Sequence, residues 1–358
     1  MARAADQPGV TVAVLNFNGR ELLEVILPSL AAQTYDQLEV VVVDNGSSDD
    51  SRAYLDEHWP SVAVVSIPEN VGVAAALNVC VRAGEGEFVL LLNNDLELND
   101  RCVEELVVAL RANPEAVVAG AKLRDYTHRE LLDGTGDVYS WAGFAYRRGQ
   151  GEIDRGQYDE LLDVFGACGA VALYRRTAFE DVGEFDERFY ALCEDVDWSF
   201  RAQLAGYDCR YVPAAIAYHI GSASLGPRLS EFTLYHNWRN QIWVIAKDYP
   251  GWAFIAHAPD LLLGQLAMLL VAARHRAVLV WLRAWRDALM GLPTVLRQRR
   301  TLQRRRVSDR HALEAVLENG FARARWWLRG SGRQTSAAAQ SPAAASHSSP
   351  APRAPSSR

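Results

Sequence analysis

The chain has 358 residues, a hydrophobic fraction of 49% and a formal net charge of −7. A chain of this length and composition can build one large core or two domains, which argues against a disordered or fibrous protein. Its five cysteines are odd in number and show no CxxC spacing, which argues against a secreted, disulfide-framed domain and for a reducing cytosol.

The two ends of the chain differ from the rest. Residues 1–9, MARAADQPG, lack the apolar core of a signal peptide, so we expect a short N-terminal arm and a cytoplasmic location for the domain that follows. Residues 334–358 consist mainly of Ala, Ser and Pro. They offer too little apolar surface to offset the entropy of ordering, which predicts a disordered tail.

From Val10 onward, short apolar runs alternate with helix-like stretches. The runs are VTVAVL, LEVVVV, VAVVSI, FVLLL, AVVAGAKL, FGACGAVALYRR and CRYVPAAIAYHIG, the last of which ends near His219. This alternation predicts βαβ units around a Rossmann-like, mostly parallel sheet flanked by helices. Residues 125–160, rich in Gly and aromatic residues, show no clear period. We expect one continuous α/β domain over residues 10–245, with two separable domains as the alternative.

Residues 246–333 are rich in Leu, Trp and Arg, and the last part of this region is strongly basic. Its longest uncharged run, Leu261 to Ala273, is shorter than the roughly 20 residues that a spanning helix needs. Apolar residues then recur at three- and four-residue spacing among arginines, at Val278, Trp281, Leu282, Trp285, Leu289, Leu292 and Leu296. This pattern predicts helices that either lie in a membrane interface or pack on the enzyme with their arginines outward. The adjacent Trp and Leu favour lipid over nucleic acid as a partner of the arginines.

Small polar residues end two of the predicted strands. Asp44 follows VVVV, and Asn93, Asn94 and Asp95 follow FVLLL. In open α/β sheets, ligands bind at the carboxyl ends of the strands, where Asp44 could accept hydrogen bonds from a base or ribose. Ser47 or Ser48 could equally cap a helix that begins nearby. A carboxylate at Asp95, beside an amide, suits Mg²⁺ or Mn²⁺ that bridges a diphosphate.

The second half of the chain adds further candidates. The string CEDVDW places Glu194, Asp195 and Asp197 at a predicted helix start, and one such carboxylate in a partly apolar pocket is a plausible general base. His219 ends a predicted strand and could ligate the metal that Asp95 binds. In ENVGVAAALN, residues 69–78, Asn70 and Gly72 stand at a strand-to-helix junction that a ligand could approach closely, although a tight turn with small-residue packing also explains them.

Seven stretches, taken in order, resemble the motifs of the family 2 inverting glycosyltransferases, and within them the bacterial rhamnosyltransferase-like branch. They are VAVLNFNG, VVVVDNGSSDDS, ENVGVAAALN, LLLNNDLEL, FGACGAVALYRR, GEFDERFYALCEDVDWSFRAQLAGY and YHIGSAS. The resemblance covers about residues 10–245, and the ordered series is specific although each member is weak. It implies a GT-A fold and transfer of one sugar from a nucleoside-diphosphate sugar to a glycan or lipid-linked glycan.

Carried over residue by residue, the resemblance implies a role for each candidate. The residues expected at the nucleotide sugar are Asn16, Phe17, Asn18, Asp44, Asn70, Gly72 and Asn94. Asp95 and His219 would bind Mg²⁺ or Mn²⁺, Asp195 would be the catalytic base, Glu194 would help to position the acceptor, and Trp198 would shape the acceptor pocket. Asn93 departs from the family pattern, since many relatives carry Asp there, so metal binding is expected to depend more on the donor diphosphate.

Other functions fit less well. A sugar nucleotidyltransferase usually carries a Gly-rich loop with basic residues near its first strand, whereas VLNFNGRELLE offers only Gly19 and Arg20. A non-catalytic nucleotide-sugar-binding protein would not need the carboxylate cluster around Asp195. A processive polysaccharide synthase would need several spanning helices. The resemblance favours dTDP-rhamnose as donor and leaves UDP-hexoses open, and neither the acceptor nor the oligomeric state can be read from the sequence.

Overall fold

The computed structural model describes residues 7–221 and 230–318, which lie within one compact unit spanning Met1–Asn319. The second unit, Gly320–Arg358, and with it the predicted tail, lies outside the described residues. The helices are α1 (Arg20–Ala31), α2 (Ser51–His58), α3 (Val73–Arg82), α4 (Cys102–Ala112), α5 (Ala178–Val182), the 3-10 helix η2 (Glu187–Phe189), α6 (Glu194–Leu204), α7 (Glu231–Asp248), α8 (Gly251–Ala256), α9 (Ala258–Arg274), α10 (Val278–Arg305) and α11 (Arg310–Val316).

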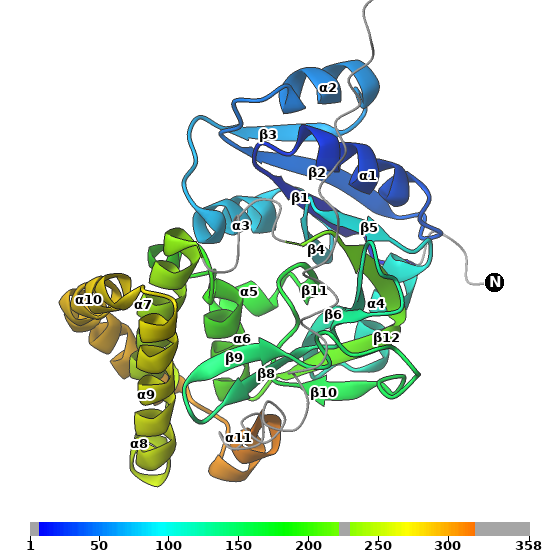
Figure 1. Cartoon of the computed structure of the whole chain (residues 1–358). Coiled ribbons are helices and arrows are strands. Elements are labelled where there is room, and N and C mark those ends of the chain that lie inside the picture. The colour runs from blue at the N-terminus through cyan, green and yellow to red at the C-terminus, as the bar shows by residue number, and fades with distance from the viewer. Residues whose placement is uncertain (1–6, 222–229, 319–358) are drawn as a thin grey trace, which may run out of the picture. The chain divides into compact units, whose positions relative to one another are not determined.

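The strands form one large sheet and one small sheet (Figure 1). Their bounds are β1 (Val10–Asn16), β2 (Leu38–Asn45), β3 (Ala63–Ile67), β4 (Phe88–Asn93), β5 (Leu96–Leu98), β6 (Ala116–Asp125), β7 (Leu132–Gly134), β8 (Asp137–Ser140), β9 (Phe144–Arg147), β10 (Leu162–Val164), β11 (Val171–Arg175), β12 (Asp208–His219) and β13 (Leu317–Glu318). The large sheet has the order β10-β12-β6-β11-β4-β1-β2-β3. Strands β3, β2, β1, β4, β6 and β12 share one direction, and β11 runs against its two neighbours. The prediction of a mostly parallel sheet flanked by helices is confirmed.

Both faces of the sheet are buried, which explains why its strands read as continuous apolar runs. Along β1, Val12 and Val14 face a core shared with α1, α2 and α4. Ala13 and Leu15 face a second core shared with α3 and α6. Helix α3 contributes small residues such as Ala74 and Ala76 to this second core, so it can approach the sheet closely. The carboxyl ends of the parallel strands remain between these two helical layers.

Residues 125–160, which show no clear period in the sequence, contain three short strands. β7 pairs with the large sheet, and β8 and β9 form a hairpin that β13 joins to complete the small sheet. Each strand has only three or four residues, too few for an alternating pattern to emerge from the sequence. The third strand of the small sheet comes from far along the chain, since Leu317 of β13 pairs with Tyr139 of β8.

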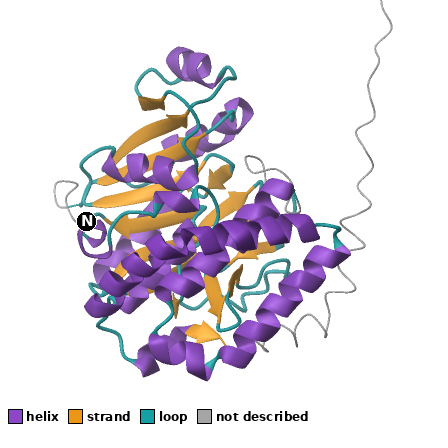
Figure 2. Ribbon diagram, turned by 90° about the vertical axis from the view of Figure 1, so that its left-hand side faces the viewer, coloured by secondary structure: helices purple, strands orange, loops and turns teal. Residues whose placement is uncertain are grey.

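The C-terminal helices pack on the domain and also expose apolar residues. Trp243 of α7 donates a hydrogen bond from its Nε1 to the carbonyl of Ala288 on α10, at 3.0 Å. The contact requires small residues on α10, since a Cβ at Gly291 would stand 2.6 Å from the Trp243 ring. Figure 2 shows these helices in front of the sheet. Leu282, Leu289 and Leu296 of the predicted apolar stripe are exposed, because α10 turns its small residues inward.

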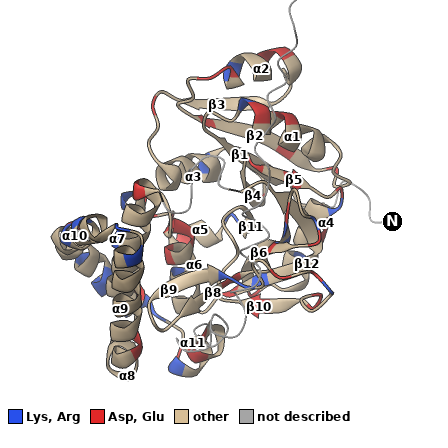
Figure 3. Cartoon of the chain, in the orientation of Figure 1, with Lys and Arg blue, Asp and Glu red and all other residues tan. Residues whose placement is uncertain are grey.

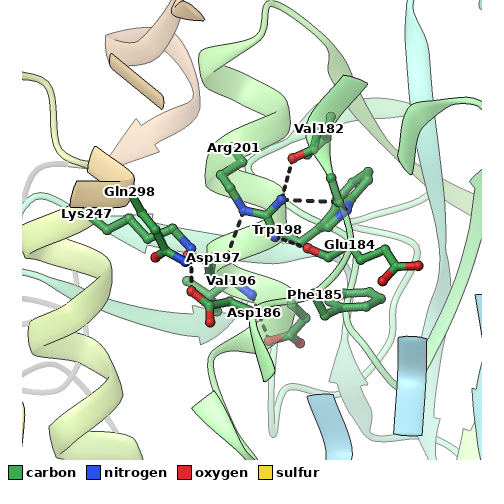
Figure 4. Close-up of polar contacts among 12 residues, drawn as sticks. Val182, Glu184, Phe185, Asp186, Val196, Asp197, Trp198, Arg201, Lys247 and Gln298 are labelled. Carbon is green, nitrogen blue, oxygen red and sulfur yellow. Dashed lines mark hydrogen bonds and ion pairs between the residues drawn. The ribbon is translucent and has the colours of Figure 1, made fainter. Parts of the chain in front are cut away.

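Asp197, the third acid of the CEDVDW string, has a structural role. Its carboxylate is completely buried and pairs with Arg201 of the same helix at 2.8 Å and with Lys247 of α7 at 2.6 Å. Lys247 also pairs with Asp186 at 3.0 Å, as Figure 4 shows. The cluster therefore ties α6 to α7 and to the segment before η2.

Asp248 lies next to Lys247 in sequence and is completely buried, and neither of its carboxyl oxygens has a hydrogen-bond partner among the described residues. Burial, and then repulsion from Asp197, raise the pKa of Asp248 well above its usual range, although Lys247 and Arg201 oppose the shift. A raised native pKa keeps the carboxyl protonated while the unfolded chain ionises near pH 4, so stability falls as pH rises above that value.

We expect Asp248→Asn, a neutral variant of the same shape, to stabilise the protein by roughly 1–3 kcal/mol at pH 8, with the gain vanishing toward pH 4. Urea unfolding midpoints at pH 4.5 and pH 8 measure the difference. An equal loss of stability at both values would instead show that Asp248 is ionised and paired in the native protein.

Candidate active site

The candidate residues of the first half lie at one edge of the sheet. β1 and β2 are in parallel register, with Asn16 opposite Asp44, and β1 and β4 align Leu15 with Asn93. β12 runs in the same direction and ends at His219. Because parallel strands present their carboxyl ends on the same side, these four strand ends form one polar edge.

Asn16 links Asp44 and Asn94, two other residues that the sequence places at the nucleotide. It is completely buried. Its Nδ2 donates to Asp44 Oδ1 at 3.0 Å, and its Oδ1 accepts from Asn94 Nδ2 at 2.8 Å. Ser47 donates its backbone N–H to Asp44 Oδ2 at 3.2 Å. The Asp44 carboxylate is thus held in one orientation by groups from β1 and from its own loop.

The loop after β2 decides between the two interpretations of Ser47 and Ser48. Helix α2 begins at Ser51, and neither serine caps it. Ser47 Oγ instead accepts from the Asn18 backbone N–H at 2.9 Å, and Asn18 Oδ1 accepts from the Ser48 N–H at 2.7 Å. The serines therefore join the β1 and β2 loops to one another. Asn18 is exposed and Phe17 is partly buried at the start of this joined loop.

Asn70 and Gly72 form the entrance to α3. Asn70 Oδ1 accepts from the Gly72 N–H at 2.9 Å and from Asn45 Nδ2 at 3.2 Å. Gly72 has a φ of 88°, and a Cβ there would come within 2.6 Å of the Tyr190 ring. Glycine is needed both for the backbone conformation and for this contact. The junction thus touches the segment that precedes Glu194 and Asp195.

Asp95 and His219 lie next to each other at the strand edge. Asp95 Oδ2 lies 3.4 Å from His219 Nε2, and both side chains are about 6% exposed. Asp95 Oδ1 is buried and has no hydrogen-bond partner among the described residues. Asp133 Oδ2 lies 2.6 Å from the other ring nitrogen, Nδ1. Burial alone would lower the pKa of His219, but the hydrogen bonds to Asp133 and Asp95 raise it above its ordinary value.

The arrangement fits a divalent cation in its chemistry. A carboxylate and an imidazole are suitable ligands for Mn²⁺ or Mg²⁺, and a carboxylate on the second ring nitrogen fixes the tautomer that such a ligand needs. The described residues contain no cluster of three or more His, Cys, Asp or Glu arranged to hold a metal by themselves. Asp95 and His219 would therefore need further oxygen ligands from a bound diphosphate or from water.

Asp133, Asp137 and Arg147 belong to the site, and the sequence interpretation missed them. Arg147 contacts Asp133 and lies 3.4 Å from His219 Nδ1. Burial opposes ionisation of Asp133, but His219 and Arg147 hold its pKa well below the usual range. Burial and the Asp195 charge raise the pKa of Asp137. The only sequence signal was an unusual density of charged residues in a region without a period.

Glu194 and Asp195 begin helix α6 on the second wall of the site. Asp195 accepts from the Gly169 N–H at 3.2 Å and from its neighbour Val196 at 2.8 Å. Burial raises the pKa of Asp195, and these two N–H groups and Arg147 act against that rise. Burial, followed by the Asp195 charge, also raises the pKa of Glu194. Glu194 Oε2 is buried without a hydrogen-bond partner among the described residues.

Two routes connect Asp195 to the strand edge. Asp195 binds Gly169, and the next residue, Ala170, accepts a hydrogen bond from the Asn93 N–H at 3.1 Å. The second route passes through Arg147, whose charge acts on Asp195 and which contacts Asp133 beside His219. The structure therefore brings the acids of α6 to the same site as Asp95 and His219.

Residues 11–183 match the model of the glycosyl transferase family 2. The chain is a glycosyltransferase, and its first half is similar to family 2. It is 29% identical over 208 residues to the O-antigen biosynthesis protein RfbC of Myxococcus xanthus, which covers 56% of this chain but only 16% of RfbC. It is 27% identical over 264 residues to the N-acetylglucosaminyl-diphospho-decaprenol L-rhamnosyltransferase of Mycobacterium tuberculosis, covering 67% of this chain and 85% of that protein.

Among solved structures, this glycosyltransferase resembles GalNAc-T7, crystallised with UDP, GalNAc and Mn²⁺. The TM-score is 0.56 and the identity 16%, and the match covers 68% of this chain and 48% of GalNAc-T7. This likeness concerns the fold, and with it the predicted GT-A architecture is confirmed. The predicted kinship with rhamnosyltransferases and the assignment of the chain as a glycosyltransferase are confirmed as well.

Trp198 cannot contact an acceptor directly, so the expectation that it shapes the acceptor pocket by direct contact is wrong. Trp198 is completely buried, and its ring packs against Tyr174 and Phe179 with centroids 4.9 Å and 5.3 Å away. Its Nε1 donates to the Gly183 carbonyl at 3.0 Å. The α6 periodicity turns Trp198 inward, three residues after Asp195, so it supports the helix from the core.

Replacement of Arg147 by Met should destabilise the glycosyltransferase by about 2–4 kcal/mol, because Asp133 and Asp137 lose their cation while they stay buried. The loss should be smaller at pH 5 than at pH 8, since the carboxyls can then protonate. Guanidinium unfolding at both pH values measures the loss. The double variant Arg147→Met/Asp137→Asn should recover part of it, and no recovery would mean that Asp137 does not interact with Arg147.

Proposed function

We propose that the protein is an inverting glycosyltransferase that moves one sugar from a nucleoside-diphosphate sugar to a hydroxyl of a glycan or lipid-linked glycan. The observation that carries the proposal is the meeting of three groups at one sheet edge. These are the oriented Asp44 carboxylate, the Asp95–His219 pair and the Glu194–Asp195 pair on α6. A nucleotide site, a diphosphate site and a base are the parts that such a transfer needs.

On the donor side, Asp44 would accept hydrogen bonds from the base or ribose. Its orientation is suitable because Asn16 donates a hydrogen bond to one carboxylate oxygen and Ser47 donates one to the other. These bonds fix the plane of the carboxylate and use only part of the hydrogen-bonding capacity of each oxygen. Phe17, Asn18, Asn70 and Gly72 line the loops on either side, and Asn94 stands beside Asn16 on the path toward Asp95. The order of these groups along the strand ends supports a nucleotide site there.

Asp95 and His219 would hold a divalent metal through Asp95 Oδ1, which lacks a partner among the described residues, and through His219 Nε2. A cation bound there would neutralise charge on the departing nucleoside diphosphate. Asp133 would keep His219 in the required tautomer. Since Asn93 supplies no charge, the donor diphosphate would complete the ligand set.

On the acceptor side, Asp195 would remove the proton from the attacking hydroxyl. Its pKa is raised by burial, which brings a carboxylate closer to the range in which it can act as a base at neutral pH. Glu194 would orient the acceptor. Attack from the face opposite the diphosphate would invert the anomeric carbon in one displacement, with no covalent sugar–enzyme intermediate.

The 27% identical rhamnosyltransferase favours dTDP-rhamnose as donor and a polyprenyl-diphosphate-linked sugar as acceptor. UDP-hexoses are the second choice. The alternatives, a sugar nucleotidyltransferase and a non-catalytic sugar-nucleotide-binding protein, receive less support because neither explains Asp195 in a buried site beside a family 2 fold.

The proposed transfer is tested by measuring nucleoside-diphosphate release from a panel of sugar nucleotides. The assay contains extracted lipid acceptor and is run with Mn²⁺, with Mg²⁺ and with chelator. We expect metal-dependent release that Asp195→Asn lowers by roughly 10²- to 10⁴-fold, and Asp95→Ala should abolish the response to metal. The control is Asp163→Asn, because Asp163 pairs with Arg210 near the opposite end of β12 from His219. A folded Asp195→Asn protein with nearly native transfer would refute the assignment.

We further propose that the enzyme works at the cytoplasmic face of the membrane, bound through one side of α9. The exposed leucines of α9 are Leu262, Leu263, Leu266 and Leu270, and no charged residue occurs between Leu261 and Ala273. Their three- and four-residue spacing places them on one helix face. The structure describes no helix that is long and apolar enough to cross a membrane. An apolar face of this kind suits a helix that lies in the interface.

The charges near α9 are complementary to an anionic bilayer. Arg274 and Arg276 follow the leucine face, and Arg283 and Arg286 are exposed at the start of α10. Figure 3 shows α10 carrying basic residues while α9 is almost uncharged. Leu279 and Met290 are also strongly exposed, at 81% and 74%. Because the exposed leucines of α9 share one face without charged residues, we assign the apolar contact mainly to α9. The arginines of α10 would then lie at the lipid headgroups.

Co-sedimentation with phosphatidylcholine vesicles containing 30% phosphatidylglycerol tests this contact. The triple variant Leu262→Ser/Leu266→Ser/Leu270→Ser should lose roughly tenfold or more of vesicle binding, because it removes the buried apolar area. A matched triple variant, Val108→Ser/Leu161→Ser/Leu162→Ser, changes apolar side chains of similar exposure elsewhere and should bind normally. Equal binding by both variants would contradict the α9 contact.

A further inference from the structure

The segment that leads into Glu194 and Asp195 has an unusual backbone. Tyr190, Leu192 and Cys193 have φ values of 65°, 69° and 67°. Residues with a Cβ rarely adopt this left-handed conformation, and three of them within four positions persist only where the surroundings impose it. The residue that immediately precedes α6, and hence the two acids of its first turn, therefore depends on contacts from elsewhere in the fold.

Those contacts come from α7. Asn240 is completely buried, and its Nδ2 lies within hydrogen-bond distance of three backbone carbonyls, those of Phe189 at 3.0 Å, Ala191 at 2.9 Å and Leu192 at 2.6 Å. Arg239 adds contacts from Nη2 to the carbonyls of Arg188 at 3.1 Å and Phe189 at 2.9 Å. The positive-φ residues Tyr190, Leu192 and Cys193 lie within or directly after the segment whose carbonyls α7 binds.

The held segment also contacts the donor side. The Tyr190 carbonyl accepts from the Ala74 N–H at the start of α3, at 3.1 Å. The Tyr190 ring fills the space that a side chain at Gly72 would need. Residues 190–193 thus lie between the α3 entrance, where the nucleotide is expected, and the first turn of α6, where the base is expected.

We propose that Asn240, assisted by Arg239, is a positioning residue that fixes the 190–193 turn and through it the place of the Asp195 carboxylate. The proposal rests on the proposed function for the role of Asp195, but the turn itself can be measured without catalysis. Asn240 lies outside the part of the chain that matches the family model, residues 11–183. The C-terminal helices are thereby part of the catalytic architecture as well as a cover for the sheet.

The test compares Asn240→Leu with the matched control Gln203→Leu. Gln203 is also a buried amide, and its Nε2 donates to the Val164 and Phe165 carbonyls at 3.2 Å and 3.1 Å, but it lies at the far end of α6 from Asp195. Both variants lose buried hydrogen bonds to backbone carbonyls. Only Asn240→Leu should increase hydrogen exchange in residues 189–196 of the full-length protein.

With dTDP-rhamnose, Mn²⁺ and extracted lipid acceptor, Asn240→Leu should lower kcat by about 10- to 100-fold, because a misplaced base costs rate, with the donor KM within about twofold of native. Gln203→Leu should leave kcat within about threefold of native. Arg239→Met, which removes the assisting contacts and keeps Asn240, should show a smaller change in the same direction and serves if Asn240→Leu does not fold.

The outcomes separate the two proposals. Unchanged exchange in residues 189–196 for both Asn240→Leu and Arg239→Met would overturn the positioning role. Equal falls in kcat for Asn240→Leu and Gln203→Leu would also overturn it, since the effect would then be general destabilisation. Absence of turnover by the native protein with every donor would refute the proposed function, while the exchange measurement would still decide whether Asn240 holds the turn.

Discussion

The parallel register of β1, β2 and β4 is the constraint on which the site depends. Asn16 stands opposite Asp44, and Leu15 stands opposite Asn93, so each strand brings the polar residues at its carboxyl end to the same edge. Asn16 can then bridge Asp44 and Asn94 while it remains completely buried. A shift of one residue in either pairing would turn these side chains toward a helical layer and leave their polar atoms without partners.

The second constraint is electrostatic. Asp95, Asp133, Asp137, Glu194 and Asp195 lie in or beside one largely buried region, where Arg147 pairs with Asp133 and His219 lies between Asp95 and Asp133. Burial favours the neutral form of each acid, and the outcome depends on local partners. Asp133, bound by Arg147 and His219, stays ionised, whereas Asp137 and Glu194 have raised pKa values. Neighbouring carboxyls can therefore differ in protonation and in role.

Much of this architecture could be predicted from the sequence, because its signals are local. Long buried strands give continuous apolar runs, and the polar residues at their ends mark the ligand edge, so Asp44, Asp95 and His219 could be placed before any coordinates. Asp133 and Arg147 could not, since they belong to strands of three and four residues, which are too short to give an alternating pattern in the sequence. Trp198 was misassigned because helical spacing alone does not tell which face of α6 meets the core. Asp197 lies two residues after Asp195 in the same acidic string, but it pairs with Lys247 and Arg201, whereas Asp195 accepts from the Gly169 N–H.

The C-terminal helices use one face for packing and another for exposed apolar residues. Helix α7 needs small residues on α10 for close packing, and Ala284, Ala288 and Gly291 supply them. Burying these small residues turns Leu and Arg side chains of α10 outward, and α9 exposes its leucines in the same way. Exposed apolar area of this extent is costly in water unless something covers it. The same α7 that packs on α10 through Trp243 also carries Asn240, which contacts the turn before Asp195. Helix α7 therefore joins the packing of the outer helices to the turn that precedes the acids of α6.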